Sequence, residues 1–154
     1  MRKIQMVDLQ SQYNFIRPQV EAGMEEVLSN AQYINGQAVK SFQSNLESYL
    51  GIKHVIPCAN GTDALQVAMM GLGLEPGDEV ITADFTFAAT VEVIALLGLT
   101  PVLVDVDPNS FNIDPRAIER AITPKTKAIV PVHLFGQVAD MLSLIHISEP
   151  TRPY

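Results

Sequence analysis

The sequence is poor in cysteine and in basic residues: it has one cysteine, Cys58, and ten lysines and arginines against seventeen acidic residues. A single cysteine excludes a disulfide framework and fits a reducing compartment. The net charge of −7, without a basic run, argues against nucleic-acid binding. No apolar stretch approaches the roughly 20 residues of a membrane span, and no signal-peptide pattern is present. We therefore expect a cytoplasmic protein without nucleic-acid or membrane partners.

Several signatures of ligand binding are also missing. The sequence has no Gly-Lys pair, which the Walker P-loop requires, and no G-x-G-x-x-G after its first expected strand. Histidines, cysteines and acidic residues do not have the spacing of a metal site, and no G-x-S-x-G elbow is present. These absences disfavour the common nucleotide-binding and hydrolase motifs, and we expect no metal.

What the sequence does contain is an alternation of apolar strands and amphipathic helices. The strands are rich in valine and isoleucine and show little alternation, as expected where helices cover both faces of a sheet. A β-α-β-α-β-α-β pattern of this kind indicates an α/β fold with a parallel sheet. Helices are expected at residues 12–30, 37–50, 62–73, 86–97 and 115–122, and strands at 54–58, 79–83, 101–106 and 126–133.

The helix expected at 37–50 carries the clearest apolar stripe. Val39, Phe42, Leu46 and Tyr49 are spaced three, four and three residues apart, so they share one helix face. We expect this face to be buried in a core.

The turn between the first strand and its helix is the most informative segment. Residues 59–65 read Ala-Asn-Gly-Thr-Asp-Ala-Leu. The first amides of a helix have no internal partner, and the helix dipole adds positive potential there, so such a turn attracts anions. Gly61 allows a close approach of the backbone, and Thr62 and Asp63 suit a first helical turn. The segment therefore predicts a phosphate-binding site.

Other segments are expected near this site, because ligands of parallel sheets bind beyond the carboxyl ends of the strands. They are Ala83–Phe87, Asp105–Asp107 and His133–Gly136. We interpret the aspartates among them mainly as turn and cap residues.

Residues 142–154 depart from this pattern. They read LSLIHISEPTRPY, with two prolines among the last five residues, and show neither a helix nor a strand that would continue the fold. We interpret them as a foreign or frayed tail, such as translated sequencing-adapter sequence joined to a truncated reading frame. Residues 1–141 then comprise an N-terminal segment and the first, incomplete part of a larger domain.

Several segments in a fixed order carry a resemblance to a known family. They are CANGTDALQ (58–66), EPGDEVIT (75–82), FTFAAT (85–90), ALLGLTP (95–101) with VDVD (104–107), AITPKTKAIVPV (121–132) and HLFGQVAD (133–140). With Val7-Asp8-Leu9 and residues 32–36, they closely resemble the DegT-type sugar aminotransferases, which are fold type I enzymes that use pyridoxal 5′-phosphate (PLP). The resemblance covers residues 4–141 and is closest to enzymes that aminate the 3-keto group of nucleotide-linked sugars.

The resemblance implies a role for several residues. Gly61, Thr62 and Asp63 would hold the PLP phosphate, and Phe87 would stack on the pyridine ring. Alternatively, Phe87 would be a core residue on an apolar helix face. Asn35 and His133 would lie at the substrate or cofactor edge, although His133 could equally be structural. The substrates would be a nucleotide-linked keto-sugar and an amino donor, typically glutamate, in polysaccharide biosynthesis, and family members are homodimers.

Two parts that the resemblance implies are not in this sequence. The Schiff-base lysine and the acidic residue beside the pyridine nitrogen follow Asp140 in the family, so no catalytic residue can be named here. The family's large domain has a seven-stranded sheet in the order 3-2-4-5-6-7-1, of which strands 1–4 are expected here, and strand 1 (residues 54–58) lacks its neighbour. We expect the isolated polypeptide to be unstable and inactive.

Three other functions stay open at this point. A sugar dehydratase of the same family would carry histidine in place of the Schiff-base lysine, at a position outside this sequence. A non-catalytic, regulatory member would retain PLP or only the fold. A nucleotide-binding α/β domain without PLP is disfavoured by the missing glycine motifs.

Overall fold

The computed structural model describes residue 4 and residues 6–149 and divides into two compact units. Unit 1 comprises Met1–Pro57 and unit 2 comprises Cys58–Tyr154. The helices of unit 1 are α1 (Leu9–Asn30) and α2 (Gln37–Leu50). Unit 2 contains α3 (Gly61–Gly71), β1 (Glu79–Ala83), α4 (Ala89–Leu96), β2 (Thr100–Val104), α5 (Pro115–Ala121), β3 (Thr126–Val130), the 3₁₀ turn η1 (Leu134–Gly136) and α6 (Met141–Ser148).

The helices of unit 1 begin and end at well-formed caps. Asp8 precedes α1, and its carboxylate accepts the amide of Ser11 at 3.0 Å. The helix ends at Ala31, which has a left-handed backbone, and α2 ends in the same way at Gly51 (φ 66°). A Cβ at Gly36 would collide with the carbonyl oxygen of Gln32, so the turn into α2 requires glycine.

Neither helix of unit 1 contains a buried residue. The stripe predicted for 37–50 lies on α2, whose bounds match the prediction, yet Tyr49 is 85% exposed and Phe42 is 56% exposed. Val39 and Leu46 are half-buried. The expectation that this face is core is therefore wrong within unit 1, because periodicity shows which face is apolar but does not supply a partner for it.

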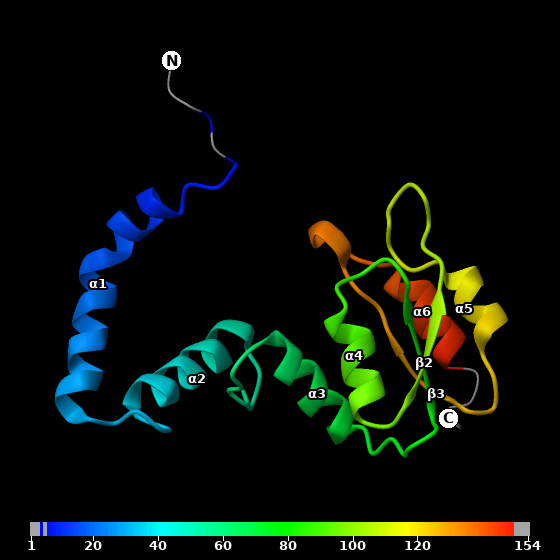
Figure 1. Ribbon diagram of the computed structural model, residues 1–154, viewed down its shortest axis with the longest axis horizontal. Coiled ribbons are helices and arrows are strands. Elements are labelled where there is room, and N and C mark those ends of the chain that lie inside the picture. Colours follow the sequence, from blue (N-terminus) through cyan, green and yellow to red (C-terminus); the bar gives the residue numbers. More distant parts are fainter. Residues whose placement is uncertain (1–3, 5, 150–154) are drawn as a thin grey trace. The chain divides into compact units, whose positions relative to one another are not determined.

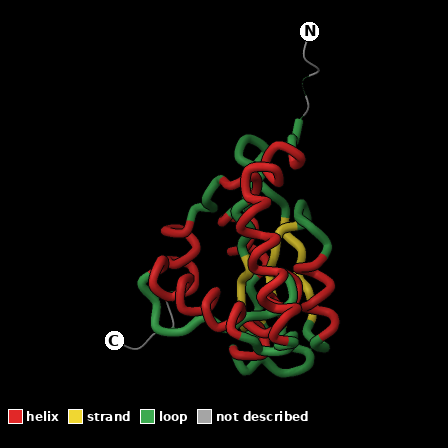
Figure 2. Tube along the Cα trace, turned by 90° about the vertical axis from the view of Figure 1, so that its left-hand side faces the viewer, coloured by secondary structure: helices red, strands yellow, loops and turns green. Residues whose placement is uncertain are grey.

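Unit 2 is built on a three-stranded parallel sheet in the order β2-β1-β3. Figure 2 shows the strands in yellow, running side by side. The parallel α/β class is confirmed, and the order matches strands 3-2-4 of the expected topology. The strand expected at 54–58 is wrong, because this stretch has no regular structure. A strand needs a hydrogen-bonded neighbour, and none of the described segments pairs with it.

The central strand β1 is buried from Val80 to its end at Ala83. Alternate side chains of this strand face opposite sides of the sheet. The hydroxyl of Thr82 donates to the carbonyl of Val130 at 2.9 Å, which joins β1 to β3 through a side chain. The register between these strands shifts between Glu79 and Val80, because Lys127 is an extra residue on β3.

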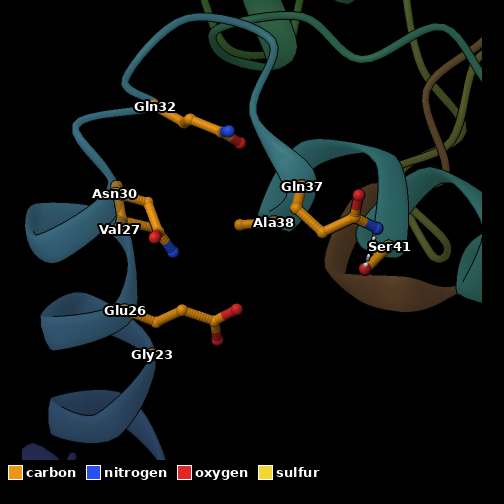
Figure 3. A pocket seen from close by; sticks show the side chains of 8 residues that line it. All are labelled: Gly23, Glu26, Val27, Asn30, Gln32, Gln37, Ala38 and Ser41. Carbon is orange, nitrogen blue, oxygen red and sulfur yellow. Dashed lines mark hydrogen bonds between the residues drawn. The ribbon is translucent and has the colours of Figure 1, made fainter.

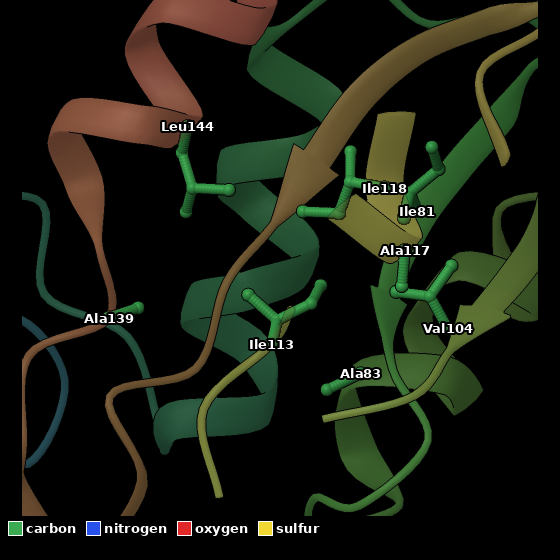
Figure 4. Packing of buried hydrophobic residues seen from close by; sticks show 8 residues of the cluster. All are labelled: Ile81, Ala83, Val104, Ile113, Ala117, Ile118, Ala139 and Leu144. Carbon is green, nitrogen blue, oxygen red and sulfur yellow. The ribbon is translucent and has the colours of Figure 1, made fainter. Parts of the chain in front are cut away.

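Helices cover both faces of this sheet (Figure 1). On one face, Val80 packs with Met69 of α3 and with Val93 and Ile94 of α4. On the other, Ile81 and Ala83 pack with α5 and α6, and Figure 4 shows this cluster around Ile118. Such a two-sided cover explains the continuous apolar strands of the sequence.

The segment that follows Asp140 is helical in the structure. Asp140 caps α6 by accepting the amide of Ser143 at 3.1 Å, Leu144 is buried, and Ile147 packs against the same cluster. The expectation that residues 142–154 have no helix is therefore wrong for residues 142–148, which belong to α6. The spacing of Met141, Leu144 and Ile147 places three apolar residues on one helix face, and this spacing favours a helix. Residues 150–154 lie outside the described part, and a foreign origin of the segment stays a prediction.

None of the helices in the described part of the chain is both long enough and apolar enough to cross a membrane.

Candidate functional site

The start of α3 is organised by Asn60, a residue without a predicted role. Asn60 has an extended backbone, and its side-chain oxygen accepts the amide of Asp63 at 2.9 Å. Its side-chain nitrogen donates to the Asp63 carboxylate at 3.2 Å, so both ends of the carboxamide are used. Asparagine directly before a helix is a strong N-cap signal, and this preference could have identified Asn60 from the sequence.

The cap leaves two amides available at the helix start. Among the hydrogen bonds of residues 6–149, none has the backbone N–H of Gly61 or Thr62 as its donor. Both point from the positive end of the helix dipole, which attracts anions. The amide of Asp63, by contrast, is already engaged by Asn60. The site therefore offers two free backbone donors together with the hydroxyl of Thr62.

Gly61 has no role that the folded chain itself requires. Its φ does not lie in the left-handed region, and a Cβ there would meet no heavy atom within 4 Å. The space beside the Gly61 Cα is therefore open, so a ligand can approach the backbone closely there.

Phe87 lies in the loop between β1 and α4, beyond the carboxyl end of β1. Its side chain is 79% exposed, so it is not a core residue in this structure. Its carbonyl accepts the amide of Thr90 at 3.4 Å, which places it one turn before the helix. An exposed aromatic ring at the ligand edge of a parallel sheet is available for stacking.

His133 lies beyond the carboxyl end of β3 and has a partner within its own loop. Its Nδ1 atom accepts the amide of Ala139 at 3.1 Å. Because a backbone amide can only donate, Nδ1 carries no proton in this arrangement, and the proton of a neutral ring lies on Nε2. This hydrogen bond supports a structural role for His133, which the sequence left open beside a place at the substrate or cofactor edge.

Asn35 belongs to unit 1, in the loop between α1 and α2, and has a left-handed backbone (φ 50°). This unit contains a cleft of about 200 Å³ between the end of α1 and the start of α2 (Figure 3). The cleft is lined by Glu26, Asn30, Gln32 and Ser41 among others, and Asn35 is not part of its lining. Asn35 therefore shapes the turn, and its expected contact with a sugar stays a prediction.

Two aspartates at the carboxyl edge of the sheet, Asp105 and Asp107, accept hydrogen bonds from nearby backbone amides. Asp107 accepts the amides of Asn109 and Ser110, each at 2.9 Å, and these bonds, led by Ser110, lower the pKa of its carboxyl. Asp105 accepts the amide of Val106 at 2.8 Å. Asp107 also borders a cleft of about 430 Å³ with Asp114 and Asp140, which cap α5 and α6. The turn interpretation is thus confirmed for Asp107.

Unit 2 holds no lysine at its ligand edge. Its two lysines, Lys125 and Lys127, lie at the start of β3, at the opposite end of the strand from its carboxyl edge. Lys127 Nζ donates to the carbonyl of Pro124 at 3.4 Å. The described residues also contain no group of three or more histidines, cysteines and acidic residues that could hold a metal ion.

Comparison with known proteins gives a consistent match. The sequence pattern of the DegT/DnrJ/EryC1/StrS aminotransferase family matches residues 15–152, and so extends into the segment interpreted as foreign. The chain is 52% identical over 137 residues to a UDP-2-acetamido-2-deoxy-3-oxo-D-glucuronate aminotransferase of Pseudomonas aeruginosa. This match covers 89% of this chain and 38% of that protein. It is 46% identical to a pleiotropic regulatory protein of Geobacillus stearothermophilus, over 95% of this chain and 39% of that protein.

Solved structures agree with the sequence matches. A DegT/DnrJ/EryC1/StrS aminotransferase from Brucella abortus superimposes with a TM-score of 0.88 at 44% identity, over 96% of this chain and 41% of that one. NtdA from Bacillus subtilis, solved with bound cofactor PMP, superimposes with a TM-score of 0.86 at 37% identity, over 96% of this chain and 35% of that one. The chain therefore spans about two fifths of the length of the curated relatives it matches.

Proposed function

Because the chain belongs to the DegT/DnrJ/EryC1/StrS aminotransferase family, we propose that it is part of a longer PLP-dependent enzyme, the parent, which transfers an amino group to a nucleotide-linked keto-sugar. Its amino donor is glutamate. The name of the P. aeruginosa relative supports a nucleotide-linked 3-oxo sugar as the acceptor. The parent acts in the cytoplasm as a homodimer and serves polysaccharide biosynthesis.

The proposal rests on the start of α3, where the amides of Gly61 and Thr62 have no partner within the described residues. A phosphate dianion suits two backbone donors, a hydroxyl and the positive end of a helix. The open space in front of Gly61 leaves room for it. These residues therefore fit the phosphate group of PLP, and PMP, the form bound in B. subtilis NtdA, carries the same phosphate.

Each proposed site residue has one task. Gly61 and Thr62 donate to the phosphate, and Asn60 keeps the helix start rigid through Asp63. The exposed ring of Phe87 stacks on the pyridine ring and fixes its tilt. Bound in this way, the cofactor supplies an electron-withdrawing ring and a carbon that exchanges amino groups. His133 borders the sugar.

The groups that move protons lie in the part of the parent that follows Asp140. Lys125 and Lys127 lie at the wrong end of β3 for this task. The chain of 154 residues is therefore inactive by itself. The reading frame of the source genome past Met141 tests where the groups that move protons lie. It should continue with family sequence to an acidic residue and a lysine.

A regulatory function is the second candidate, and one observation favours it: the G. stearothermophilus relative at 46% identity is named a pleiotropic regulatory protein. A parent of this kind would bind PLP, or keep only the fold, without transferring an amino group. A sugar dehydratase, with histidine at the lysine position, would bind PLP and release water from its sugar.

Titration of the parent with PLP, followed by absorbance, tests the site. Thr62→Val removes the hydroxyl and should weaken PLP binding by about tenfold to a hundredfold, as expected for a hydrogen bond to a charged group. Gly61→Val fills the open space beside the backbone and should weaken PLP binding by a similar factor, because its side chain hinders the approach of the phosphate. Thr100→Val, at an exposed position at the start of β2, is the matched control and should leave the affinity unchanged. Unchanged affinity in both site variants would overturn the phosphate site.

Activity separates the candidate functions. The wild-type parent should convert glutamate to 2-oxoglutarate in the presence of a nucleotide-linked 3-keto sugar. PLP binding without this conversion would support the regulatory candidate, and release of water from the sugar would support the dehydratase.

A further inference from the structure

A second feature of the carboxyl edge is the buried side chain of Asn112, which follows β2 in the chain. It is 5% exposed and is one of three buried polar residues in the described part of the chain. Its side-chain nitrogen donates to the carbonyls of Gln137 (3.1 Å) and Val138 (3.2 Å). Its side-chain oxygen accepts the amide of Leu134 at 3.1 Å. One carboxamide thus ties the loop after β2 to the loop after β3, and all its bonds are to backbone.

Three phenylalanines from three different loops meet at this junction. Phe85 follows β1, Phe111 precedes Asn112, and Phe135 lies inside the loop that Asn112 holds. The ring centroids of Phe85 and Phe111 are 5.7 Å apart, and those of Phe111 and Phe135 are 6.4 Å apart with the rings nearly perpendicular. These are the distances of interacting aromatic pairs. We call these three rings the aromatic surface.

The aromatic surface is maintained at a conformational cost. Phe111 (φ 59°) and Phe135 (φ 55°) both have left-handed backbones, which bulky residues rarely adopt. Phe135 is 83% exposed, so burial does not repay this strain. Strained residues of this kind are retained where the surrounding structure fixes them, and here the bonds of Asn112 do so.

The charge of the surrounding loops limits what the aromatic surface can contact. Residues 84–88, 105–114 and 131–140 contain no lysine or arginine, whereas Asp84, Asp105 and Asp107 lie among them. Negative potential disfavours a diphosphate at this place, and the exposed rings favour a flat, uncharged ring. The base of a nucleotide-linked sugar is the part of the proposed substrate with this chemistry.

We propose that Asn112 is a positioning residue that fixes the Leu134–Val138 segment, so that Phe85, Phe111 and Phe135 form a preformed surface on which the substrate's nucleobase stacks. This inference rests on the proposed function for the identity of the substrate. It adds a contact for the base, separate from the residues that hold the cofactor.

Binding of UDP, GDP, dTDP and inorganic pyrophosphate to the parent, loaded with PLP, tests the inference. Phe135→Ala should weaken the tightest of the three nucleotides by about tenfold, because it removes an exposed stacking ring. It should leave pyrophosphate and PLP affinities unchanged, and Phe135→Tyr, which keeps the ring, should restore nucleotide binding. Leu96→Ala, an exposed position on α4 (67%), is the matched control and should change nothing.

Asn112→Ala tests the positioning role itself. It should reproduce the tenfold loss for the nucleotide and raise the KM of the nucleotide-linked sugar without changing that of glutamate. The amide of Leu134 should also exchange its hydrogen faster, since its acceptor is gone. If Asn112→Ala does not fold, Phe135→Ala and Phe135→Tyr decide alone, because Phe135 is exposed.

The inference is overturned if the wild-type parent binds no nucleotide better than pyrophosphate, or if Phe135→Ala leaves nucleotide binding unchanged. Equal losses for nucleotide and pyrophosphate would also contradict it. Reaction of glutamate with the PLP-loaded parent is measured separately. Its failure would contradict the proposed function, whereas the nucleotide titrations would still decide on the aromatic surface.

Discussion

The two units translate the same kind of sequence pattern into different structures. Both contain helices with apolar faces, yet α1 and α2 of unit 1 bury no residue, whereas β1 of unit 2 is buried from Val80 to Ala83. In unit 2, strands and helices cover each other's apolar faces, and two clusters of buried residues result. Periodicity therefore predicts which face is apolar, and topology decides whether that face becomes a core.

The largest expected difference between the units is in the response to truncation of an apolar side chain. Ile118→Ala in the parent should lower the free energy of unfolding by about 2–5 kcal/mol, because Ile118 is fully buried between α5 and the sheet. Tyr49→Ala on α2, which is 85% exposed, should change it by no more than about 0.5 kcal/mol. Urea unfolding of the parent measures both. A large effect of Tyr49→Ala would break the comparison and show that another surface of the parent covers α2.

A smaller effect on stability is expected from replacing one helix-terminal glycine in each unit by alanine. Gly36→Ala should destabilise the parent by about 1–3 kcal/mol, because the added Cβ collides with the Gln32 carbonyl. Gly71→Ala at the end of α3 meets no atom within 4 Å and should stabilise it by about 0.4–1 kcal/mol. Thermal unfolding of both variants gives the two signs, and equal signs would contradict the close approach in unit 1.

The next effect concerns the hydroxyl that links β1 to β3. Thr82→Val keeps the shape of the side chain and removes the donor to the Val130 carbonyl, so we expect a loss of about 1 kcal/mol. Urea unfolding of the parent, with Thr100→Val as the exposed control, measures it. If both valine variants unfold at the same urea concentration, this hydrogen bond contributes nothing to the sheet.

The smallest effects are expected at two matched helix caps, Asp8 in unit 1 and Asp140 in unit 2. Each carboxylate accepts the amide and the hydroxyl of a serine three residues later, Ser11 or Ser143, and these bonds lower the pKa of each aspartate below 3.8. The stabilisation is therefore complete above pH 3.8 and is lost as the pH falls through the lower, folded value.

Carboxyl titration of this chain by NMR measures both caps. Ser11→Ala and Ser143→Ala should each raise the pKa of their own aspartate toward 3.8 and leave the other unchanged. A pKa of 3.8 for both aspartates in the unmodified chain would mean that neither helix start is formed.

The regular elements could be predicted from the sequence where local pattern and tertiary partner agree. The helix at 37–50 has the predicted bounds because Gly36 and Gly51 delimit it, and the strand at 79–83 is found as expected because its neighbours β2 and β3 are present. The strand at 54–58 was expected from its apolar residues alone, and it fails because no described strand pairs with it.

The site could be predicted in part. The free amides of Gly61 and Thr62 are predictable because the first amides of a helix have no partner within it. Asn60 was within reach of the same reasoning, since N-cap preferences are local. The role of Asn112 could not be predicted in this way, because its partners lie 22 to 26 residues away. No short-range pattern marks a carboxamide that forms hydrogen bonds with a distant loop.

The extra residue on β3 has a consequence for how the chain behaves in a crowded solution. β3 is an outer strand of the three-stranded sheet in the described part of the chain, and the register shift leaves Lys127, an exposed residue, without a partner opposite it on β1. A second polypeptide adding to this rim would have to desolvate an ammonium group at the first step of zippering. The charge of Lys127 thus disfavours strand addition along the first half of this edge. The stretch from Ala128 to Val130 is the part of β3 that remains open to pairing with a second polypeptide.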